Sequence, residues 1–384
     1  MTDAAALLAE ILANPDDDEP RLVYADWLGQ HDDPRGELIQ LQCELARRDG
    51  ARELNDRANA LLRRHEQRWG AEAGIRQMGV VWERGFPAGL IGGSDALLGE
   101  VDALRTQPIT WLRLRLRSES IEEVAALPEL AKIRLLELRP DPTSGQVRDP
   151  HAPDAVNAYA LAMLGASSHL TGLRELVFSE GAVDRLAARS LVRAAWLPQL
   201  EELVMPGALL DRSVLAKLAG RIPAMRRLLV DRSELGFRGL EAIAESAMRE
   251  LDMLSLARCD RAGLEALVRS ESVRTVRCLS LAGTHAIDDD ASVLATAREL
   301  GILEDLDLAE NAIGPAGAAA LAASTTLRSL HRLDLRANQL GDAGAFALAE
   351  ATGLSELVEL DVSDNAIHAA AAERLRRRYR SVRV

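Results

Sequence analysis

A short apolar phrase recurs near the C-terminus at a fixed interval, and this regularity leaves few folds open to the chain. Each copy reads Leu-x-x-Leu-x-(Leu or Val)-x-x-Asn-x-(Ile or Leu), and the copies begin at Leu303, Leu330 and Leu357, 27 residues apart. After the first two copies comes a Gly-x-x-Gly segment with apolar residues at helical spacing, at 314–321 and 341–348. Each repeat is therefore expected to contain a strand, a turn and a helix.

Weaker copies of the phrase extend the array toward the N-terminus. They begin at Leu173, Leu200, Met225, Leu251 and Val276, and two less regular copies begin at Ile109 and Leu130. One such unit has an apolar edge too small to be buried alone, whereas stacked parallel strands and parallel helices bury a continuous apolar column. We therefore expect about ten strand–helix units that pack as a solenoid, with function on the faces that stacking leaves open.

The phrase resembles the leucine-rich repeat, and its Gly-x-x-Gly helix starts resemble the ribonuclease-inhibitor-like subclass of that family. The resemblance covers roughly residues 80–384. It implies an α/β solenoid of horseshoe form over residues 79–384, with a concave parallel sheet and convex helices. A loop insertion is expected at about 139–157, where Pro140–Gly145 gives a loop signal, and it is either a passive surface loop or a binding element.

A C-terminal cap is expected at about 372–384, because the end of a solenoid would otherwise expose apolar faces and an unpaired strand edge. The Arg-rich turn at 376–380 favours a charged cap over a nucleic-acid or membrane tail. Several apolar positions keep a buried pattern through this turn, namely Leu375, Tyr379, Val382 and Val384.

Asn311, Asn338 and Asn365 stand where the three regular strands turn away. An amide at this point can satisfy backbone groups of the neighbouring turn, so we interpret these residues as a structural ladder. The equivalent upstream positions hold shorter side chains that can bond the turn less completely, namely Thr284, Cys259 and Ser233. Cys259 is accordingly interpreted as a ladder residue rather than a nucleophile.

Residues 1–78 are predicted to form a small all-α domain, because four stretches carry apolar residues at helical spacing. Several segments resemble the bacterial repeat-companion domain, a family that typically precedes leucine-rich repeats. These segments are Asp17–Leu28, Asp33–Gln42, His65–Trp69 and Glu83–Phe86. The resemblance implies an architecture and no particular activity.

Two charged features of this domain allow a structural and a chemical interpretation. Asp16–Glu19 precede Pro20, which favours a helix start with carboxylates at the positive end of the helix dipole over a metal site. Asp26 and Arg35 are expected to form a structural ion pair rather than a catalytic pair.

Composition and charge narrow the partners. The net charge of −13 argues against a general nucleic-acid binder, because neutralising phosphates needs an excess of Lys and Arg on some face. Residues 1–20 lack the basic start of a secretory signal, and no apolar run approaches the roughly 18 residues of a membrane span. The three cysteines lack the spacing of a disulfide framework or a zinc site. These observations predict a cytoplasmic protein without cofactor or metal, and with no nucleic-acid or membrane partner. We also expect it to be monomeric, and the resemblance to the repeat-companion domain implies a bacterial protein.

No familiar catalytic motif occurs in the sequence: it lacks a phosphate loop, a His-Glu-x-x-His helix, a nucleophile elbow and a Cys-x-x-Cys pair. Cys43 lies in a predicted helix and is interpreted as an ordinary, partly buried thiol. The sequence therefore predicts a protein that is not an enzyme. The alternatives are a GTPase-activating or ubiquitin-ligase-like regulator and a structural self-assembly module.

The open face of the sheet is the predicted binding surface, because residues that flank the inward leucines of each strand point out. The predicted partner-binding residues are Trp111, Arg113, Arg115, Lys132, Arg134, Met253, Asp305, Asp307, Asp334, Glu359 and Asp361. Ser255, Ala257, Cys278, Ser280 and Ala282 are also expected to be exposed on this face. The face runs from basic through weakly apolar to acidic, and we expect Trp111 and Met253 to anchor a partner.

These positions predict a non-catalytic protein–protein interaction scaffold whose partner is an unidentified protein. Asp307, Asp334 and Asp361 should stack on adjacent strands about 4.8 Å apart. Two unit charges at that distance repel by roughly 1 kcal/mol even at the dielectric constant of water, and a basic partner would relieve this repulsion. The alternative is that Arg332 and Arg336 already neutralise the aspartates, and that Asp is merely usual at this position of the repeat.

Overall fold

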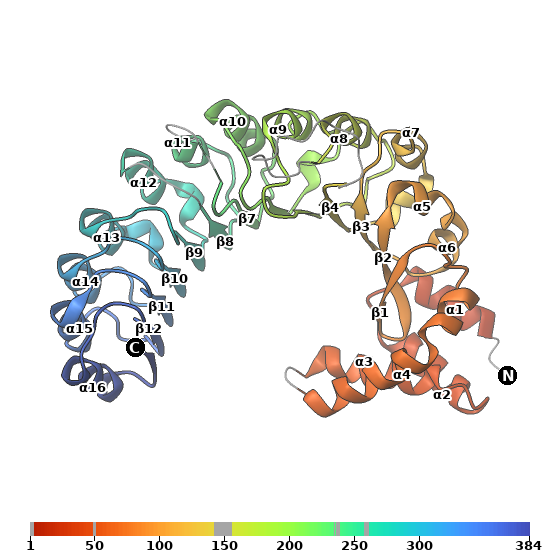
Figure 1. Ribbon diagram of the computed structural model, residues 1–384, viewed down its shortest axis with the longest axis horizontal. Helices are drawn as coiled ribbons and strands as arrows, with labels where there is room; N and C mark the ends of the chain where they lie inside the picture. Colours follow the sequence, from red (N-terminus) through yellow and green to blue (C-terminus); the bar gives the residue numbers. More distant parts are fainter. Residues whose placement is uncertain (1–3, 49–50, 142–155, 234, 236–238, 257–260) are drawn as a thin grey trace. The chain divides into compact units, whose positions relative to one another are not determined.

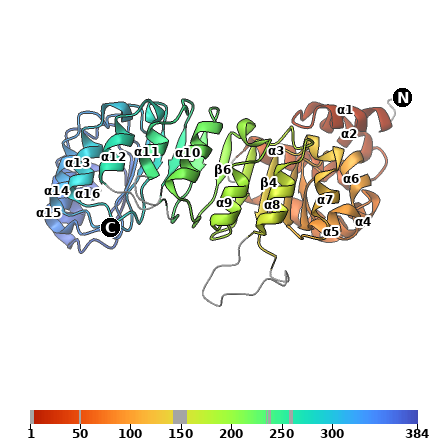
Figure 2. The ribbon, with the colours of Figure 1, turned by 90° about the horizontal axis from the view of Figure 1, so that it is seen from above.

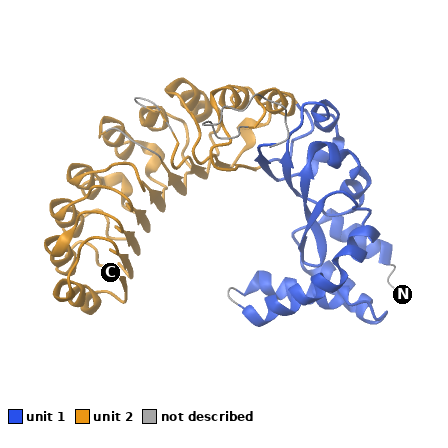
Figure 3. Ribbon diagram, viewed as in Figure 1, with its two compact units in different colours: residues 1–144, 167–173 blue, residues 145–166, 174–384 orange. Residues whose placement is uncertain are grey.

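The structure is a computed structural model that describes residues 4–48, 51–141, 156–233, 235, 239–256 and 261–384 (Figure 1). The chain divides into two compact units (Figure 3). Unit 1 comprises residues 1–144 and 167–173, and unit 2 comprises residues 145–166 and 174–384. Most of the expected loop insertion, Ala257 and Cys259 lie outside the described residues.

Unit 1 begins with four helices, as the apolar spacing predicts. They are α1 (Ala4–Ala13), α2 (Glu19–Gly29), α3 (Arg35–Arg47) and α4 (Arg52–Glu72). Helix α2 starts at Glu19, the last residue of the acidic run, and has Pro20 in its first turn, where the missing N–H needs no partner. Asp18 makes no side-chain cap but pairs with Arg47 at 3.1 Å and with Arg84 at 2.7 Å. The acidic run therefore starts a helix and joins it to two other elements.

A β-hairpin follows the helices and departs from the expected all-parallel array. Strands β1 (Gly79–Glu83) and β2 (Phe86–Gly93) pair antiparallel. The turn needs Gly85, whose φ is +77° and whose added Cβ would lie 2.1 Å from the side chain of Ile39 on α3.

The hairpin also completes the core of the helices. Phe86 packs in a buried cluster with Leu7, Ile11, Ile39 and other residues of the first three helices. Trp82 packs in a second cluster with Trp69 of α4. Although β1 starts at the expected boundary after residue 78, the helices do not bury their core without the hairpin.

The rest of unit 1 consists of parallel strand–helix units. They contain α5 (Ser94–Leu98), α6 (Val101–Thr106), β3 (Trp111–Arg115), α7 (Ile121–Ala125), the 3₁₀ helix η1 (Pro128–Lys132) and β4 (Leu135–Arg139). Leu112 and Leu114 are buried and pair with Leu136 and Leu138. The expected register of the Leu130 copy is therefore wrong, because the inward residues of this repeat are Ile133, Leu136 and Leu138.

Unit 2 stacks parallel strands on its inner side and helices on its outer side (Figures 1 and 2). Its strands are β5 (Glu175–Phe178), β6 (Glu202–Val204), β7 (Arg227–Leu229), β8 (Met253–Ser255), β9 (Cys278–Ser280), β10 (Asp305–Asp307), β11 (Arg332–Asp334), β12 (Glu359–Asp361) and β13 (Ser381–Arg383). Each strand pairs with the next one along the chain, in parallel and in register.

The outer layer of unit 2 is made of short helices. They are α8 (Ala158–Gly165), α9 (Arg185–Leu191), α10 (Arg212–Arg221), α11 (Gly239–Ala244), α12 (Arg261–Val268), α13 (Asp288–Ala295), α14 (Pro315–Ala322), α15 (Gly341–Ala349) and α16 (Ala369–Arg378). Three 3₁₀ helices lead into strands, namely η2 (Leu197–Gln199), η3 (Glu271–Val273) and η4 (Arg298–Leu300). The middle residue of each strand points between the layers, so that Leu306, Leu333 and Leu360 form one buried column.

The asparagines bind neighbouring repeats to one another. Asn338 donates from Nδ2 to the carbonyl oxygen of Leu308 at 2.9 Å and of Leu335 at 3.0 Å, and its Oδ1 accepts from the Ile313 amide at 2.9 Å. Asn311 and Asn365 make the equivalent bonds. The shorter upstream side chains keep part of this pattern, since the hydroxyls of Thr284 and Ser233 donate to the carbonyl oxygens of Leu281 and Met205.

Helix α16 and strand β13 close the C-terminal end of unit 2. The helix begins three residues before the expected cap, and its residue Leu375 is fully buried. Tyr379 is 5% exposed and donates from its hydroxyl to the carbonyl oxygen of Leu348 at 2.7 Å. Several arginines around these buried residues are exposed, so apolar packing and surface charge combine in this terminal segment.

Candidate protein-binding surface

The strands of unit 2 present two rows of side chains on their inner face, because the outer two residues of each three-residue strand point away from the buried column. Row A comprises the first strand residues Glu175, Glu202, Arg227, Met253, Cys278, Asp305, Arg332, Glu359 and Ser381. Row B comprises the third strand residues Val177, Val204, Leu229, Ser255, Ser280, Asp307, Asp334, Asp361 and Arg383. The predicted partner-binding residues from Met253 to Asp361 all belong to one of these rows. Two of the other positions expected to be exposed differ: Ala282 follows β9 and belongs to neither row, and Ser255 is only 7% exposed.

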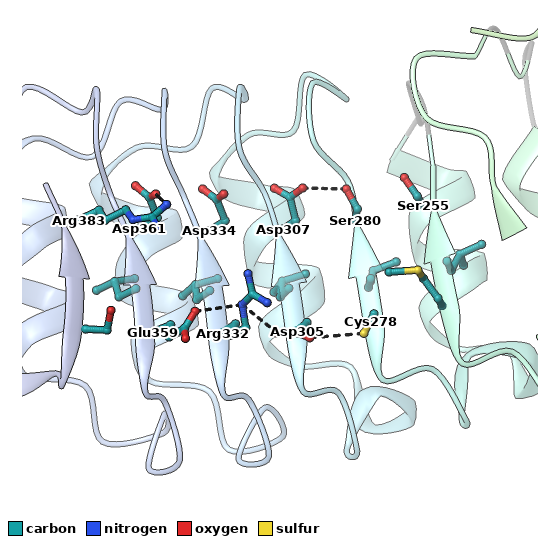
Figure 4. Close-up of a pocket in the computed structure, with 17 residues that line it drawn as sticks. Ser255, Cys278, Ser280, Asp305, Asp307, Arg332, Asp334, Glu359, Asp361 and Arg383 are labelled. Atoms are coloured by element: carbon teal, nitrogen blue, oxygen red, sulfur yellow. Dashed lines mark hydrogen bonds and ion pairs between the residues drawn. The ribbon is translucent and has the colours of Figure 1, made fainter. Parts of the chain in front are cut away.

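A shallow hollow of about 400 Å³ extends along both rows from β8 to β13 (Figure 4). Five carboxylates and two guanidinium groups line it, namely Asp305, Asp307, Asp334, Glu359, Asp361, Arg332 and Arg383. The hollow therefore has an excess of negative charge.

Row A balances part of that charge internally. The Arg332 Nε lies 3.5 Å from the Asp305 Oδ1 and 3.2 Å from the Glu359 Oε2 (Figure 4). The Cys278 thiol donates to the Asp305 Oδ2 at 3.5 Å. Burial, followed by this hydrogen bond and the Asp305 charge, raises the pKa of the Cys278 thiol to about 11. Cys278 is thus held as a protonated thiol near neutral pH.

Row B carries three consecutive aspartates with a common local geometry. In each of Asp307, Asp334 and Asp361, the Oδ1 accepts a hydrogen bond of 3.0 Å from the backbone N–H two residues later. This bond closes the turn that follows the strand, as short polar side chains commonly do. It leaves the Oδ2 of each carboxylate toward the inner face.

The Oδ2 atoms of the three aspartates lie near different polar groups. The Ser280 hydroxyl donates to the Asp307 Oδ2 at 3.0 Å, and the Arg383 Nη1 lies 3.7 Å from the Asp361 Oδ2. The Arg336 Nε lies 3.6 Å from the Asp334 Oδ2.

Asp334 lies among charges of both signs. Burial raises the pKa of its carboxyl, the charges of Asp307 and Asp361 raise it further, and Arg336 opposes them. Of the two arginines considered as neutralising groups, Arg336 pairs with this row, whereas Arg332 pairs within row A.

The same row changes character on β5, β6 and β7. Val177, Val204 and Leu229 are register partners and are half-buried, so they form an apolar strip on the inner face. The sequence analysis did not select these residues, although they occupy the same positions of the repeat phrase as Ser280 and Asp307. Their position within the phrase was the available signal, but the prediction relied on charged and aromatic side chains.

The predicted residues of unit 1 have a different arrangement. Trp111, Arg113 and Arg115 lie on β3, and the Arg113 guanidinium sits 5.3 Å from the Trp111 ring centre and 2.6 Å from a Glu137 carboxylate oxygen. Trp111 lies against Gly89, where an added Cβ would meet the indole ring at 1.8 Å. Trp111 therefore covers the neighbouring strand as much as it faces outward.

Lys132 and Arg134 do not lie on the strand, which corrects their expected place on the binding face. Lys132 ends η1 and donates from Nζ to the Gln107 carbonyl oxygen at 2.6 Å. Burial lowers the pKa of this amine to about 8. Arg134 precedes β4 and forms an ion pair with Asp16. Both errors follow from the register error in this repeat.

The expected Asp26–Arg35 ion pair is also wrong. Arg35 donates from Nε to the Gly85 carbonyl oxygen at 2.9 Å and lies over the rings of Phe86 and Trp82. Asp26 is exposed and accepts instead from the Gln40 side chain at 3.2 Å. Arg35 thus holds the hairpin turn against α3.

The described residues offer few side chains suited to metal binding or nucleophilic chemistry. No group of three or more His, Cys, Asp or Glu side chains with a geometry suited to a metal ion occurs there. Cys43 is buried, and burial together with the Asp18 charge raises the pKa of its thiol to about 11. Within the same residues, no helix combines the length and apolar character needed to cross a bilayer.

A comparison with known protein families locates part of the repeat array in the sequence. A family described as Leucine Rich repeat matches residues 303–322 and 326–349, which contain β10, α14, β11 and α15. A search of curated proteins found no significant match.

Three solved structures are similar at low identity. A chain of the Rad7 and Elc1 complex in yeast is 16% identical over 73% of this chain and 69% of that chain, with a TM-score of 0.48. An internalin (inlF) from Listeria monocytogenes is 15% identical over 74% and 75%, with a TM-score of 0.42. A protein of Bacteroides fragilis is 14% identical over 84% and 86%, with a TM-score of 0.40.

The family match coincides with the regular part of the structure. The matched residues contribute in-register parallel strands, outer helices and two of the bridging asparagines, Asn311 and Asn338. Sequence family and repeat geometry together identify residues 303–349 as leucine-rich repeats.

Proposed function

We propose that the protein is a non-catalytic interaction scaffold that binds a positively charged segment of another protein on the inner face of unit 2, at β10 to β12. The observation that carries this proposal is the common geometry of Asp307, Asp334 and Asp361. One oxygen of each carboxylate closes its own turn, and the other lies 3.0 to 3.7 Å from a polar side chain, in residues that line the hollow of the inner face.

The turn explains a polar acceptor at these positions but not a charge. An asparagine would supply the same Oδ1 acceptor without placing like charges on neighbouring strands. Each adjacent pair of unit charges repels by roughly 1 kcal/mol even in water. Burial is the largest cause of the raised pKa of the Asp334 carboxyl, and the charges of Asp307 and Asp361 add to it. A partner that brings Lys or Arg to this row removes the repulsion when it binds.

A catalytic role has less support. Thioester chemistry of the ubiquitin-ligase kind needs an accessible thiolate, and Cys278 and Cys43 both have thiol pKa values raised to about 11. On β3, Trp111 and Arg113 contact residues of their own unit, whereas Arg115 is exposed. We retain these three residues as a second candidate contact surface, on unit 1.

Site-specific photo-crosslinking tests the proposed face. The full chain carries benzoylphenylalanine either at Ser280 in row B or at Glu350 after α15, and both proteins are irradiated in extract of the source cells. We expect discrete protein adducts from position 280 that fade at 0.5 M salt, and none of these adducts from position 350. The triple variant Asp307→Asn/Asp334→Asn/Asp361→Asn should lose the position 280 adducts, because it keeps the turn bonds and removes only the charge.

A matched control removes the same charge elsewhere. Glu245, Glu350 and Glu373 are exposed and lie away from rows A and B. Their triple change to Gln should leave the position 280 adducts intact. Equal loss in both triple variants, or equal adducts from both label positions, would sink the assignment of the binding face.

A further inference from the structure

Row B changes chemically from β5 to β12, and Arg383 on β13 then ends it with a positive charge next to Asp361. On β5, β6 and β7 it is apolar, with Val177, Val204 and Leu229 half-buried. On β8 and β9 it carries only the small hydroxyls of Ser255 and Ser280. On β10 to β12 it carries three carboxylates. All these positions are register partners in turn, so the gradient is continuous across one sheet face.

We propose that the partner segment is a single amphipathic helix that lies across the strands, with an apolar end on β5 to β7 and a Lys- or Arg-rich end on β10 to β12. This inference rests on the proposed function and specifies the chemistry and conformation of the partner. Apolar side chains of the partner can bury area against the apolar strip, which stabilises the complex. The aspartates offer negative charge to the basic end of the partner segment.

The spacing of the strands favours a helix over an extended peptide. Neighbouring strands are about 4.8 Å apart, and the pitch of an α-helix is about 5.4 Å, so that nearly one turn corresponds to each strand. Same-side residues of an extended chain are about 6.7 Å apart and drift out of step within two strands. Arginines at positions i, i+4 and i+7 of a helix can therefore face Asp307, Asp334 and Asp361 in turn.

The dimensions of the face suit the same occupant. A three-residue strand is about 10 Å long, close to the 10–12 Å diameter of a helix with its side chains. The centre of the apolar strip on β6 and the centre of the acidic row on β11 are five strand steps apart, or about 24 Å, which a helix of about 16 residues spans. The small side chains of Ser255 and Ser280 leave room between the two ends, where the hollow begins (Figure 4).

Designed peptides test the inference directly. The bipartite probe is a 22-residue helical peptide with leucines at i, i+4 and i+7 in one half and arginines at the same spacing in the other, made in both sequence directions. A basic-only probe replaces the leucines with alanine, and an apolar-only probe replaces the arginines with glutamine. A fourth probe carries two central prolines, which prevent a continuous helix. Binding to the full chain is measured by fluorescence anisotropy.

Two variants of the protein separate the ends of the face. Asp307→Asn/Asp334→Asn/Asp361→Asn removes the acidic row, and Val177→Ser/Val204→Ser/Leu229→Ser removes the apolar strip. The control is the triple Glu→Gln change at Glu245, Glu350 and Glu373. Each inner-face variant also provides a test of its own folding, because a folded variant should keep its affinity for the probe that uses the unchanged end.

We expect the bipartite probe, in one of its two directions, to bind at least tenfold more tightly than either single-ended probe and the proline probe. The Asn variant should weaken the bipartite and basic-only probes, the Ser variant should weaken the bipartite and apolar-only probes, and the control should change neither. A proline probe as tight as the helical one, or single-ended probes as tight as the bipartite one, would overturn the inference. If the basic-only probe still responds to the Asn variant in that case, the proposed function stands, and if no probe responds to it, both fail.

Discussion

Single residues in this protein combine a structural and an electrostatic role in the same side chain. The Oδ1 of Asp334 accepts from the Arg336 amide and closes a turn, while its Oδ2 lies 3.6 Å from the Arg336 guanidinium. Asparagine would fulfil the first role and remove the second. Substitution by Asn therefore separates the two roles more sharply than substitution by Ala or Arg.

Tyr379 allows a prediction about stability and pH. Its buried hydroxyl donates to the Leu348 carbonyl oxygen, which also accepts from the Ala351 amide, so Tyr379→Phe should cost only about 1 kcal/mol. Burial raises the pKa of the phenol to about 12, whereas it is about 10 in the unfolded chain. Above pH 10 the unfolded state therefore loses this proton first, and the contribution of Tyr379 is fully present below pH 10 and lost toward pH 12.

Urea unfolding at pH 8 and pH 11 measures this contribution. The difference in midpoint between wild type and Tyr379→Phe should shrink at pH 11. A difference that stays constant or grows would show that the hydroxyl is not held protonated in the fold.

Cys278 gives a second prediction at this scale. Asp305 accepts its thiol proton and contributes to the raised thiol pKa of about 11, although burial is the larger cause. Asp305→Asn should therefore lower the pKa and speed alkylation of Cys278 by iodoacetamide several-fold at pH 8, because the thiolate is the nucleophile. Mass spectrometry of the Cys278 peptide gives the rate. Glu359→Gln is the control, since it removes the other carboxylate bound to Arg332 without touching the thiol, and an equal acceleration there would contradict the assignment.

Elements were predictable where the repeat phrase leaves a single register. Strands β10, β11 and β12 fall inside the regular copies, and their inward leucines and outward residues follow from the phrase alone. Strand β4 lies in a run with apolar residues at 130, 133, 135, 136 and 138, which fits two registers equally well. Pairing with β3 decides between them, and that information is tertiary.

The asparagine ladder predicts a graded loss of stability. Asn338→Ala removes donors to Leu308 and Leu335 and the acceptor for Ile313 in a site that is 8% exposed, so we expect a loss of about 2–3 kcal/mol. Asn338→Ser should lose less, because the hydroxyls of Thr284 and Ser233 keep one cross-repeat or local bond at the equivalent positions.

Urea unfolding of the three proteins gives the order. Wild type should be the most stable, the Ser variant intermediate and the Ala variant the least stable. An Ala variant as stable as wild type would mean that backbone pairing alone holds neighbouring repeats together.

At the scale of the whole molecule, the helices at the start of the chain share their cores with a β-hairpin that the sequence analysis did not predict. Helical periodicity ends before residue 78, yet Trp82 and Phe86 complete the two cores of the helices. Periodicity reports which side of an element is buried and not which element covers it. The candidate site was predictable at its charged positions, whereas its apolar strip emerged only when strand register aligned Val177, Val204 and Leu229.

The C-terminal end offers the last prediction, which concerns the molecule as a whole. Deleting residues 366–384 removes α16 and β13, and so exposes the edge of β12 together with the apolar side of α15. An uncovered strand edge and an open apolar face favour association between chains. We expect the deletion variant to form aggregates in light scattering at micromolar concentration, at a pH well above the isoelectric point of about 5.2 where the intact chain stays dispersed.

A second variant separates coverage from charge. Arg376→Glu/Arg380→Glu keeps the apolar contacts of Leu375 and Tyr379 and reverses two exposed charges. If the cap works by covering the end, this variant stays dispersed while the deletion aggregates. If the cap works by charge repulsion between the ends of two chains, the two new glutamates offset the charges of Arg377 and Arg378. The repulsion is then weaker, and the variant should associate more than wild type. A dispersed deletion variant would contradict both accounts, because it would show that the last repeat needs no cap.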